Sequence, residues 1–163
     1  MAQSNNSALV RKVVALSAAG AFSALAYLVP VQEGTAYKAY RDPIGIPTIC
    51  EGKTEGVKMG DTVTPDQCAA WLAPRLREEL AYVRSVTRGP MPDTRAVALA
   101  DFTYNVGRGT YARSSILRKL NAGDVVGGCN ALTLYVYAGG KQLPGLVQRR
   151  QVEKELCLYA ETH

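Results

Sequence analysis

The sequence contains very little histidine, since His163 is the single one among 163 residues. Nucleophilic systems of the Ser-His-Asp or Cys-His type need an imidazole base, and the common zinc sites need several histidines or cysteines close together. The cysteines also lack the C-x-x-C spacing of zinc and redox motifs. They are Cys50, Cys68, Cys129 and Cys157. Hydrolysis by carboxylates needs no histidine and stays compatible with this composition. We expect neither a metal nor a cofactor.

Long basic runs are also absent. The net charge is +5, and Arg11 and Lys12 supply two positive charges before the first acidic residue, Glu33. Without a Lys/Arg run or interleaved aromatic residues the sequence indicates no nucleic-acid partner, and its mild basicity suits wall polymers or anionic lipid. A chain of 163 residues with 47% apolar content can form one domain with a core but not two of ordinary size. We expect a monomer.

Charge is missing altogether between residues 13 and 32. About twenty uncharged residues can span a bilayer as a helix, and the preceding Arg11-Lys12 pair would keep the N-terminus in the cytoplasm. Nine of the residues from Val13 to Val29 are Ala, Ser or Gly, so insertion into lipid is only weakly favourable. A cleaved signal peptide is the alternative, because Ala24-Leu25-Ala26 offers a small-x-small cleavage site.

One short segment does contain two carboxylates and a hydroxyl, on Glu33, Asp42 and Thr48. The segment is helix-like around Glu33 and changes at Tyr40, where Asp42 and Gly45 indicate a turn before a strand. Acid/base cleavage of an acetal such as a glycosidic bond needs one shielded, protonated carboxyl group and one exposed, ionised one. Taken singly, however, the three residues are more readily explained as a helix cap, a turn residue and a strand former.

The surrounding residues favour catalysis. Glu33-Gly34, Tyr40-Arg41-Asp42, Gly45 and Thr48-Ile49-x-x-Gly52 together resemble the catalytic segment of phage-type lysozymes, glycoside hydrolase family 24. The resemblance covers roughly residues 33 to 160 in order. It continues through Phe102 to Gly109, Ser115 to Asp124 and Tyr137 to Glu153. It implies a muramidase that hydrolyses the β-1,4 bond between N-acetylmuramic acid and N-acetylglucosamine in peptidoglycan and so lyses the host cell.

The resemblance also implies a role for each residue of the segment. Glu33 would be the general acid that protonates the leaving glycosidic oxygen. Asp42 would orient the attacking water or stabilise positive charge, and Thr48 would place its hydroxyl beside that water.

Two further positions, Arg149 and Lys53, lie outside this trio. The resemblance implies that Arg149 supports the helix carrying the acid, whereas the local pattern of Arg149, Arg150 and Glu153 alone is typical of a solvated helix face. Lys53 departs from the family, in which many relatives carry His, and this departure puts a supporting salt bridge in doubt.

The implied fold is α+β and lysozyme-like, with a small antiparallel β lobe and a helical lobe, preceded by an N-terminal membrane-targeting helix. Sequence patterns predict one or two hairpins over residues 49–64 and a helix begun by the capping box of Thr64 and Gln67, with Trp71 packed in its region. Helices are predicted over residues 65–86, 94–105, 114–122, 124–137 and 145–159.

Certain phage endolysins carry a weakly apolar signal-anchor segment, the signal-arrest-release segment, that holds the enzyme in the inner membrane and later lets it slip into the periplasm. The Ala, Ser and Gly bias of residues 13–32 favours this interpretation. We therefore expect an anchor over residues 1–32, a lysozyme catalytic domain over residues 33–163, and two partners, the peptidoglycan glycan strands and the host inner membrane.

Four cysteines behind an export segment favour disulfides. Three pairings are possible. We prefer Cys50 with Cys68, which ties the strand after the active segment to the next helix, and Cys129 with Cys157, which ties the last two helices.

Two other classes of function stay open. A lytic transglycosylase would need the acid Glu33 but no water-positioning Asp42. A wall-binding or membrane-tethered interaction protein without enzymatic activity would tolerate the loss of Glu33.

Overall fold

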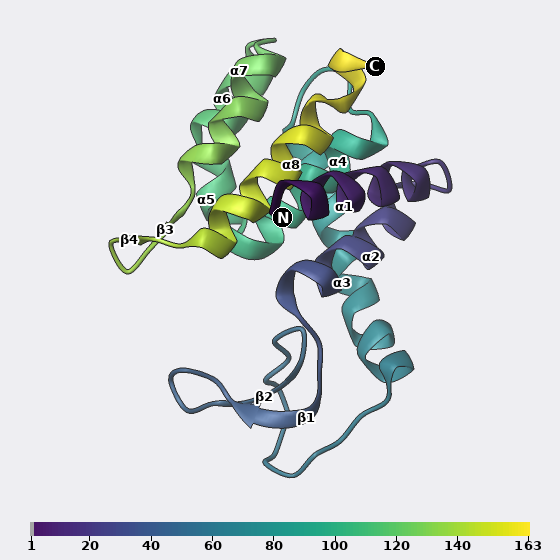
Figure 1. Ribbon diagram of the computed structural model, residues 1–163, viewed down its shortest axis with the longest axis vertical. Coiled ribbons are helices and arrows are strands. Elements are labelled where there is room, and N and C mark those ends of the chain that lie inside the picture. The colour runs from purple at the N-terminus through teal and green to yellow at the C-terminus, as the bar shows by residue number, and fades with distance from the viewer. Residues whose placement is uncertain (1) are drawn as a thin grey trace.

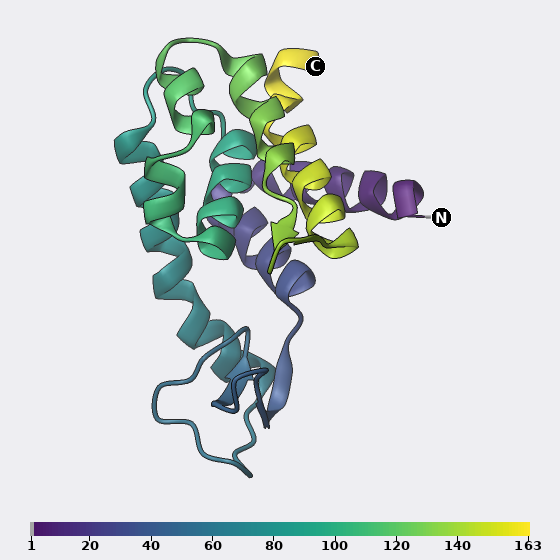
Figure 2. The same cartoon turned by 90° about the vertical axis from the view of Figure 1, so that its left-hand side faces the viewer.

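The computed structural model describes residues 2–163 and has two lobes (Figure 1). The larger lobe consists mainly of helices and contains the C-terminus, and the smaller lobe is built around strands β1 and β2 at the opposite end of the molecule. The long helix α3 (Pro65–Val86) runs from one lobe to the other, as Figure 2 shows from the side. The predicted α+β architecture with small antiparallel sheets is therefore confirmed.

The helical lobe is organised around α4, in which every side chain from Thr94 to Thr103 is buried. Helices α2, α3 and α8 pack against it. The helices after α3 are α4 (Asp93–Val106), α5 (Arg108–Ala112), α6 (Ser115–Asn121), α7 (Val125–Ala131) and α8 (Pro144–Thr162). Most predicted helices agree with these bounds to within a few residues, whereas the short helix α5 was not predicted.

The predicted capping box at the start of α3 is present. Thr64 Oγ1 accepts a hydrogen bond from the backbone N–H of Gln67 at 3.2 Å, and Gln67 Oε1 accepts one from the N–H of Thr64 at 2.8 Å. Two orphan donors of the first turn are thus satisfied reciprocally. Trp71, which we expected to pack inside, is 44% exposed.

The helix predicted over residues 124–137 ends early, at Ala131. A 3-10 turn (Leu132–Leu134) and a hairpin of β3 (Tyr137–Ala138) and β4 (Lys141–Gln142) follow. Gly139 and Gly140 between these strands have φ of +56° and +75°, the conformation that a two-residue hairpin turn requires. The glycine-rich turn thus overrides the helical pattern that precedes it.

The uncharged N-terminal stretch is divided between two helices, α1 (Ala2–Ser17) and α2 (Ala21–Glu33), with Gly20 between them at φ +114°. Buried side chains of this pair join the main core and include Val13, Ala24, Leu25, Leu28 and Val29, each 0% exposed. No helix of residues 2–163 is long and apolar enough to cross a membrane. The membrane-targeting helix and the boundary after residue 32 stay predictions.

The small lobe contains one hairpin, which lies earlier than predicted. Strands β1 (Ala36–Arg41) and β2 (Pro47–Cys50) pair antiparallel, with Tyr40 opposite Thr48. The helical pattern expected after Glu33 is therefore wrong, and Tyr37 and Tyr40 are exposed strand residues. Most of residues 51–64 form turns and isolated bridges rather than the one or two hairpins predicted over residues 49–64.

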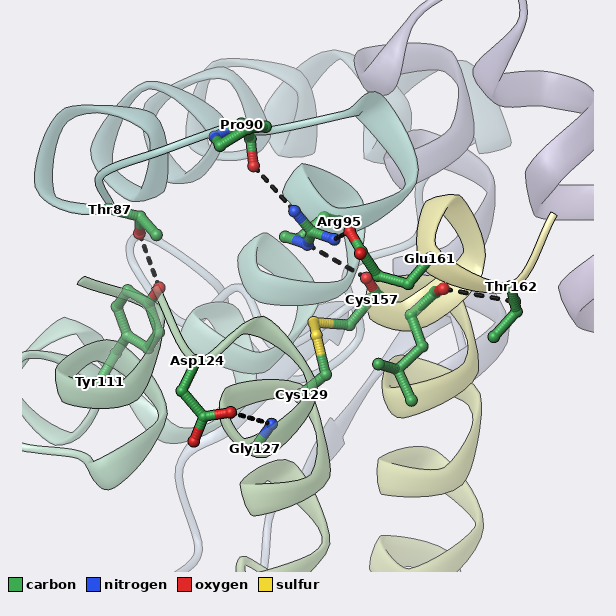
Figure 3. The surroundings of a disulfide bond; sticks show 11 residues. Thr87, Pro90, Arg95, Tyr111, Asp124, Gly127, Cys129, Cys157, Glu161 and Thr162 are labelled. Carbon is green, nitrogen blue, oxygen red and sulfur yellow. Dashed lines mark hydrogen bonds and ion pairs between the residues drawn. A yellow bond between two sulfur atoms is a disulfide. The ribbon is translucent and has the colours of Figure 1, made fainter. Parts of the chain in front are cut away.

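Two disulfides are present, and they have the pairing preferred from the sequence. Cys50–Cys68 joins β2 to α3, and Cys129–Cys157 joins α7 to α8. Figure 3 shows the second disulfide beside the buried Arg95. Arg95 donates hydrogen bonds to the carbonyl oxygens of Cys157 and Pro90 and forms an ion pair with Glu161 at 2.7 Å. The end of α8 is thus held to α7 by the disulfide and to the start of α4 by the polar contacts of Arg95.

Candidate active site

Glu33 is the last residue of α2, and its side chain is 26% exposed. Gly34 follows with φ +76° and leads the chain out of the helix toward β1. The C-terminal end of a helix carries the negative end of the helix dipole, which disfavours a carboxylate there. Glu33 therefore needs a positive partner, and α8 supplies one.

That partner is Arg149, whose Nη1 lies 2.6 Å from Glu33 Oε1. The same guanidinium donates to the Asp101 carboxylate on α4, from Nη2 at 2.8 Å and from Nε at 3.1 Å, and its Nε lies 3.5 Å from Glu153 Oε1. Burial acts to lower the pKa of Arg149, but Asp101, Glu33 and Glu153 outweigh burial and raise it. Arg149 is therefore a permanent buried cation that joins α2, α4 and α8.

Arg150 and Glu153 form a second buried pair next to Arg149. Arg150 Nη1 lies 3.0 Å from Glu153 Oε2, Arg150 Nη2 donates to Asn105 Oδ1, and the Arg150 guanidinium stacks 4.8 Å from the ring centroid of Phe102. Arg149, Arg150 and Glu153 are 4%, 0% and 0% exposed, so reading them as a solvated helix face is wrong. Burial, together with the Asp101 carboxylate, raises the pKa of Glu153 well above its ordinary value.

Asp42 begins the turn between β1 and β2. Its Oδ1 accepts hydrogen bonds from the backbone N–H groups of Ile44 at 3.0 Å and Ile46 at 2.8 Å, and Arg41 Nη1 donates to the carbonyl of Gly45 at 2.8 Å. These bonds fix the direction of the carboxylate. Within residues 2–163, Asp42 Oδ2 makes no hydrogen bond or ion pair, so this oxygen can take a water molecule.

Thr48 lies on β2 and is 3% exposed. Its hydroxyl donates to the carbonyl oxygen of Ile46 at 3.0 Å. A hydroxyl has one proton and two lone pairs, so Thr48 Oγ1 can still accept a hydrogen bond. Asp42 and Thr48 are therefore presented by the two ends of one turn, while Glu33 enters from α2 at the junction with the other lobe.

The structure thus joins Glu33 directly to Arg149 and groups Asp42 with Thr48, but no contact among residues 2–163 links the two groups. Sequence reasoning missed Asp101 and Glu153, which share Arg149 with Glu33. Asp101 could have been found, because it is a lone charge within the apolar run from Val97 to Phe102.

One cluster resembles a metal site by distance alone. Cys50, Glu51 and Cys68 place one ligand atom each within 4.8 Å of one another. Both sulfur atoms already belong to the Cys50–Cys68 disulfide, so they are not available as thiolate ligands.

Comparison with known proteins settles the family. The profile of the phage lysozyme family matches residues 31–153. This chain belongs to the phage lysozyme family. It is 40% identical over 130 residues to the SAR-endolysin of Bacteriophage PS119, covering 79% of this chain and 78% of that one. It is 36% identical over 160 residues to the SAR-endolysin of Enterobacteria phage PA-2, covering 93% and 97%.

Among solved structures, the active form of the P1 phage endolysin Lyz has a TM-score of 0.73 at 27% identity, covering 93% of this chain and 94% of that one. The secreted inactive form of the same endolysin has a TM-score of only 0.51 at 29% identity, covering 66% and 76%. The fold is therefore lysozyme-like, as expected. As a phage lysozyme, the protein is a glycoside hydrolase acting on peptidoglycan.

Proposed function

We propose that this phage lysozyme is a muramidase that cleaves the β-1,4 bond between N-acetylmuramic acid and N-acetylglucosamine with Glu33 as general acid. The placement of Glu33 carries the proposal. One of its oxygens lies 2.6 Å from Arg149, and the side chain stays 26% exposed. Within residues 2–163 its Oε2 has no partner and is available to give a proton to the leaving oxygen.

Asp42 and Thr48 would act on the water. The Asp42 carboxylate is oriented through Oδ1 and has Oδ2 free among the described residues, so it can accept one proton of the attacking water. Thr48 gives its own proton to Ile46 and can only accept from that water. In an inverting hydrolysis, water attacks the face opposite the leaving group, and the two carboxyl groups lie about 6.5 to 9.5 Å apart.

We further propose that residues 13–32 anchor the protein in the host inner membrane before lysis and form the α1–α2 hairpin after release into the periplasm. Both relatives above are SAR-endolysins, and residues 13–32 of this chain are uncharged and only weakly apolar. Leu25, Leu28 and Val29 cannot face lipid and fill the core at once. The tethered protein would therefore lack part of its core, and Glu33, one residue beyond the stretch, would lack its place beside Arg149.

The two forms of P1 Lyz support this order of events. This chain resembles the active form over 93% of its length and the secreted inactive form over 66%. The fold seen here, with α1 and α2 in the core, is thus more similar to the active form than to the secreted inactive form, and we assign it to the released state.

The experiment is digestion of purified peptidoglycan by the full-length chain, with mass spectrometry of the soluble fragments. The full chain is required because α1 and α2 supply part of the core. We expect fragments ending in a reducing N-acetylmuramic acid that contains one added water. Anhydromuramic ends would identify a lytic transglycosylase instead, and wall binding without any sugar release would identify a non-enzymatic protein.

A further inference from the structure

A cavity of about 370 Å³ lies between the loop after β2 and the helices α3 and α4, outside the trio of Glu33, Asp42 and Thr48. Its lining combines charges of both signs with two aromatic rings. The residues that matter are Glu51, Lys53, Glu55, Trp71, Arg75 and Tyr104. Nothing in the proposed hydrolysis uses this cavity.

The two cations of the cavity lie over aromatic rings rather than beside carboxylates. Lys53 Nζ is 5.1 Å from the ring centroid of Trp71, and Arg75 Cζ is 4.4 Å from that of Tyr104. Within residues 2–163, neither side chain forms an ion pair or a hydrogen bond. A guanidinium stacked on a ring keeps the N–H donors at its edge free, so both cations remain available to an anion.

The acidic residues of the lining do not neutralise these cations. Glu51 Oε1 accepts a hydrogen bond from the Thr35 hydroxyl at 2.6 Å, and the exposed Glu55 has no ion pair among the described residues. The cavity therefore offers two cationic groups together with carboxylates and the 44% exposed face of Trp71. A ligand that fills it should carry carboxylates, an ammonium group and some apolar surface.

Tyr104 connects this cavity to the candidate active site. Its hydroxyl donates to the carbonyl oxygen of Glu51 at 3.1 Å. Burial raises the pKa of Tyr104, Arg75 opposes that effect, and the negative charges of Glu33 and Glu51 add to it. Tyr104 also lies on α4 one turn after Asp101, which binds the Arg149 that contacts Glu33, so the cavity and the site share α4 and one substrate can span both.

We propose that this cavity binds the peptide that branches from muramic acid in peptidoglycan, with Lys53 and Arg75 pairing with its carboxylates. The inference rests on the proposed muramidase function. Wall peptides of this kind carry free carboxylates, a free amine in their diamino acid and the methyl groups of alanine, which match the cations, the acids and Trp71. Neutral N-acetyl sugars would leave both cations without a partner.

The test compares two substrates that differ only in the peptide. One is purified peptidoglycan of the diamino-acid type, and the other is the same glycan after an amidase has removed its peptides. The Lys53→Gln/Arg75→Gln double variant is measured on both, beside the Lys58→Gln/Arg118→Gln variant, which removes the same charge at exposed positions. Circular dichroism and thermal unfolding check that both variants fold.

We expect kcat/KM of the Lys53/Arg75 variant on the peptide-bearing wall to fall about tenfold, mainly because KM rises. On the stripped glycan, the fall in kcat/KM should be at least fivefold smaller. The control should lose equally on both. Binding of the free wall tetrapeptide, followed by calorimetry, should also weaken about tenfold in the double variant alone. Equal losses on the two substrates, or tetrapeptide binding that does not change, would overturn the inference. If the wild type released sugars from neither substrate, the proposed function itself would fail.

Discussion

Arg149 Nη1 lies 2.6 Å from Glu33 Oε1, while Nη2 and Nε of the same guanidinium donate to the buried Asp101 carboxylate at 2.8 and 3.1 Å. The position of the candidate acid at the end of α2 is therefore set by α4 and α8, two helices far away in the sequence. In the proposed mechanism, the helical lobe orients Glu33, and the β hairpin presents Asp42 and Thr48 to the same substrate.

Replacing Arg149 should destabilise the protein and disorder Glu33. Arg149→Gln removes the cation but leaves Asp101, 0% exposed, without its guanidinium partner. Breaking a buried pair on one side typically costs about 3 to 5 kcal/mol, and we expect a loss of this size in urea unfolding. Arg118→Gln, at an exposed position, is the control and should cost less than about 0.5 kcal/mol. A loss below about 1 kcal/mol at Arg149 would contradict the role of this residue.

Glu153 should give the stability a distinctive dependence on pH. In the folded protein, burial and Asp101 raise the pKa of Glu153 well above its ordinary 4.5. As the pH rises above that value, the unfolded chain loses this proton first, so the free energy of unfolding should fall by up to about 1.4 kcal/mol per pH unit until the folded pKa is passed. Glu153→Gln cannot ionise and should lack this component. If the free energies of unfolding of the wild type and Glu153→Gln changed in parallel between about pH 5 and pH 7, Glu153 would not carry this proton in the folded protein.

Asp42→Asn should separate the role of Asp42 in the turn from its role in catalysis. The amide oxygen can accept the same hydrogen bonds from Ile44 and Ile46, so the hairpin should stay folded. The amide cannot take a proton from water, and we expect wall hydrolysis to fall by about a hundredfold or more. NMR of the first product of the wild type should show inversion at the anomeric carbon. Retained configuration, or an Asp42→Asn variant with most of its activity, would oppose the proposed mechanism.

The anchor can be tested at positions that do not touch the core. Ala15, Ala18 and Ala19 are exposed in the folded protein, so changing all three to Leu should strengthen membrane insertion without overpacking. We expect this variant to stay in the membrane fraction and to delay lysis, whereas a matched triple Ser variant should be released. Ala24, at 0% exposure, is unsuitable because a Leu there would also strain the released fold. A mature periplasmic protein that begins near Tyr27 would instead identify a cleaved signal peptide.

Local rules predicted the parts of this fold that depend on neighbours in sequence. The capping box of Thr64 and Gln67 starts α3 as expected, because both hydrogen bonds form within one turn. The same rules failed to predict burial where it depends on contacts between residues distant in the sequence. Arg150 and Glu153 have the spacing of an exposed ion pair, and only the packing of α8 on α4 makes them buried.

The candidate site shows the same division. The register of Glu33, Asp42 and Thr48 was visible in the sequence through its resemblance to the family. The Asp101 and Glu153 partners of Arg149 were not, because they depend on how three helices meet. The residues between Glu33 and Tyr40 were expected to be helix-like. They form β1 instead, which pairs with β2 across the turn that the Asp42 carboxylate stabilises.

The central claim is that Glu33 delivers the proton that breaks the glycosidic bond, and Glu33→Gln tests it most directly. The amide keeps the shape of the side chain and can still accept a hydrogen bond from Arg149, so the variant should fold and bind the wall as the wild type does. The measurement is the rate at which new reducing ends appear in purified peptidoglycan, with wall binding and thermal unfolding recorded on the same sample. We predict a rate at least about a hundredfold below that of the wild type. A folded Glu33→Gln variant within tenfold of the wild-type rate would contradict the assignment.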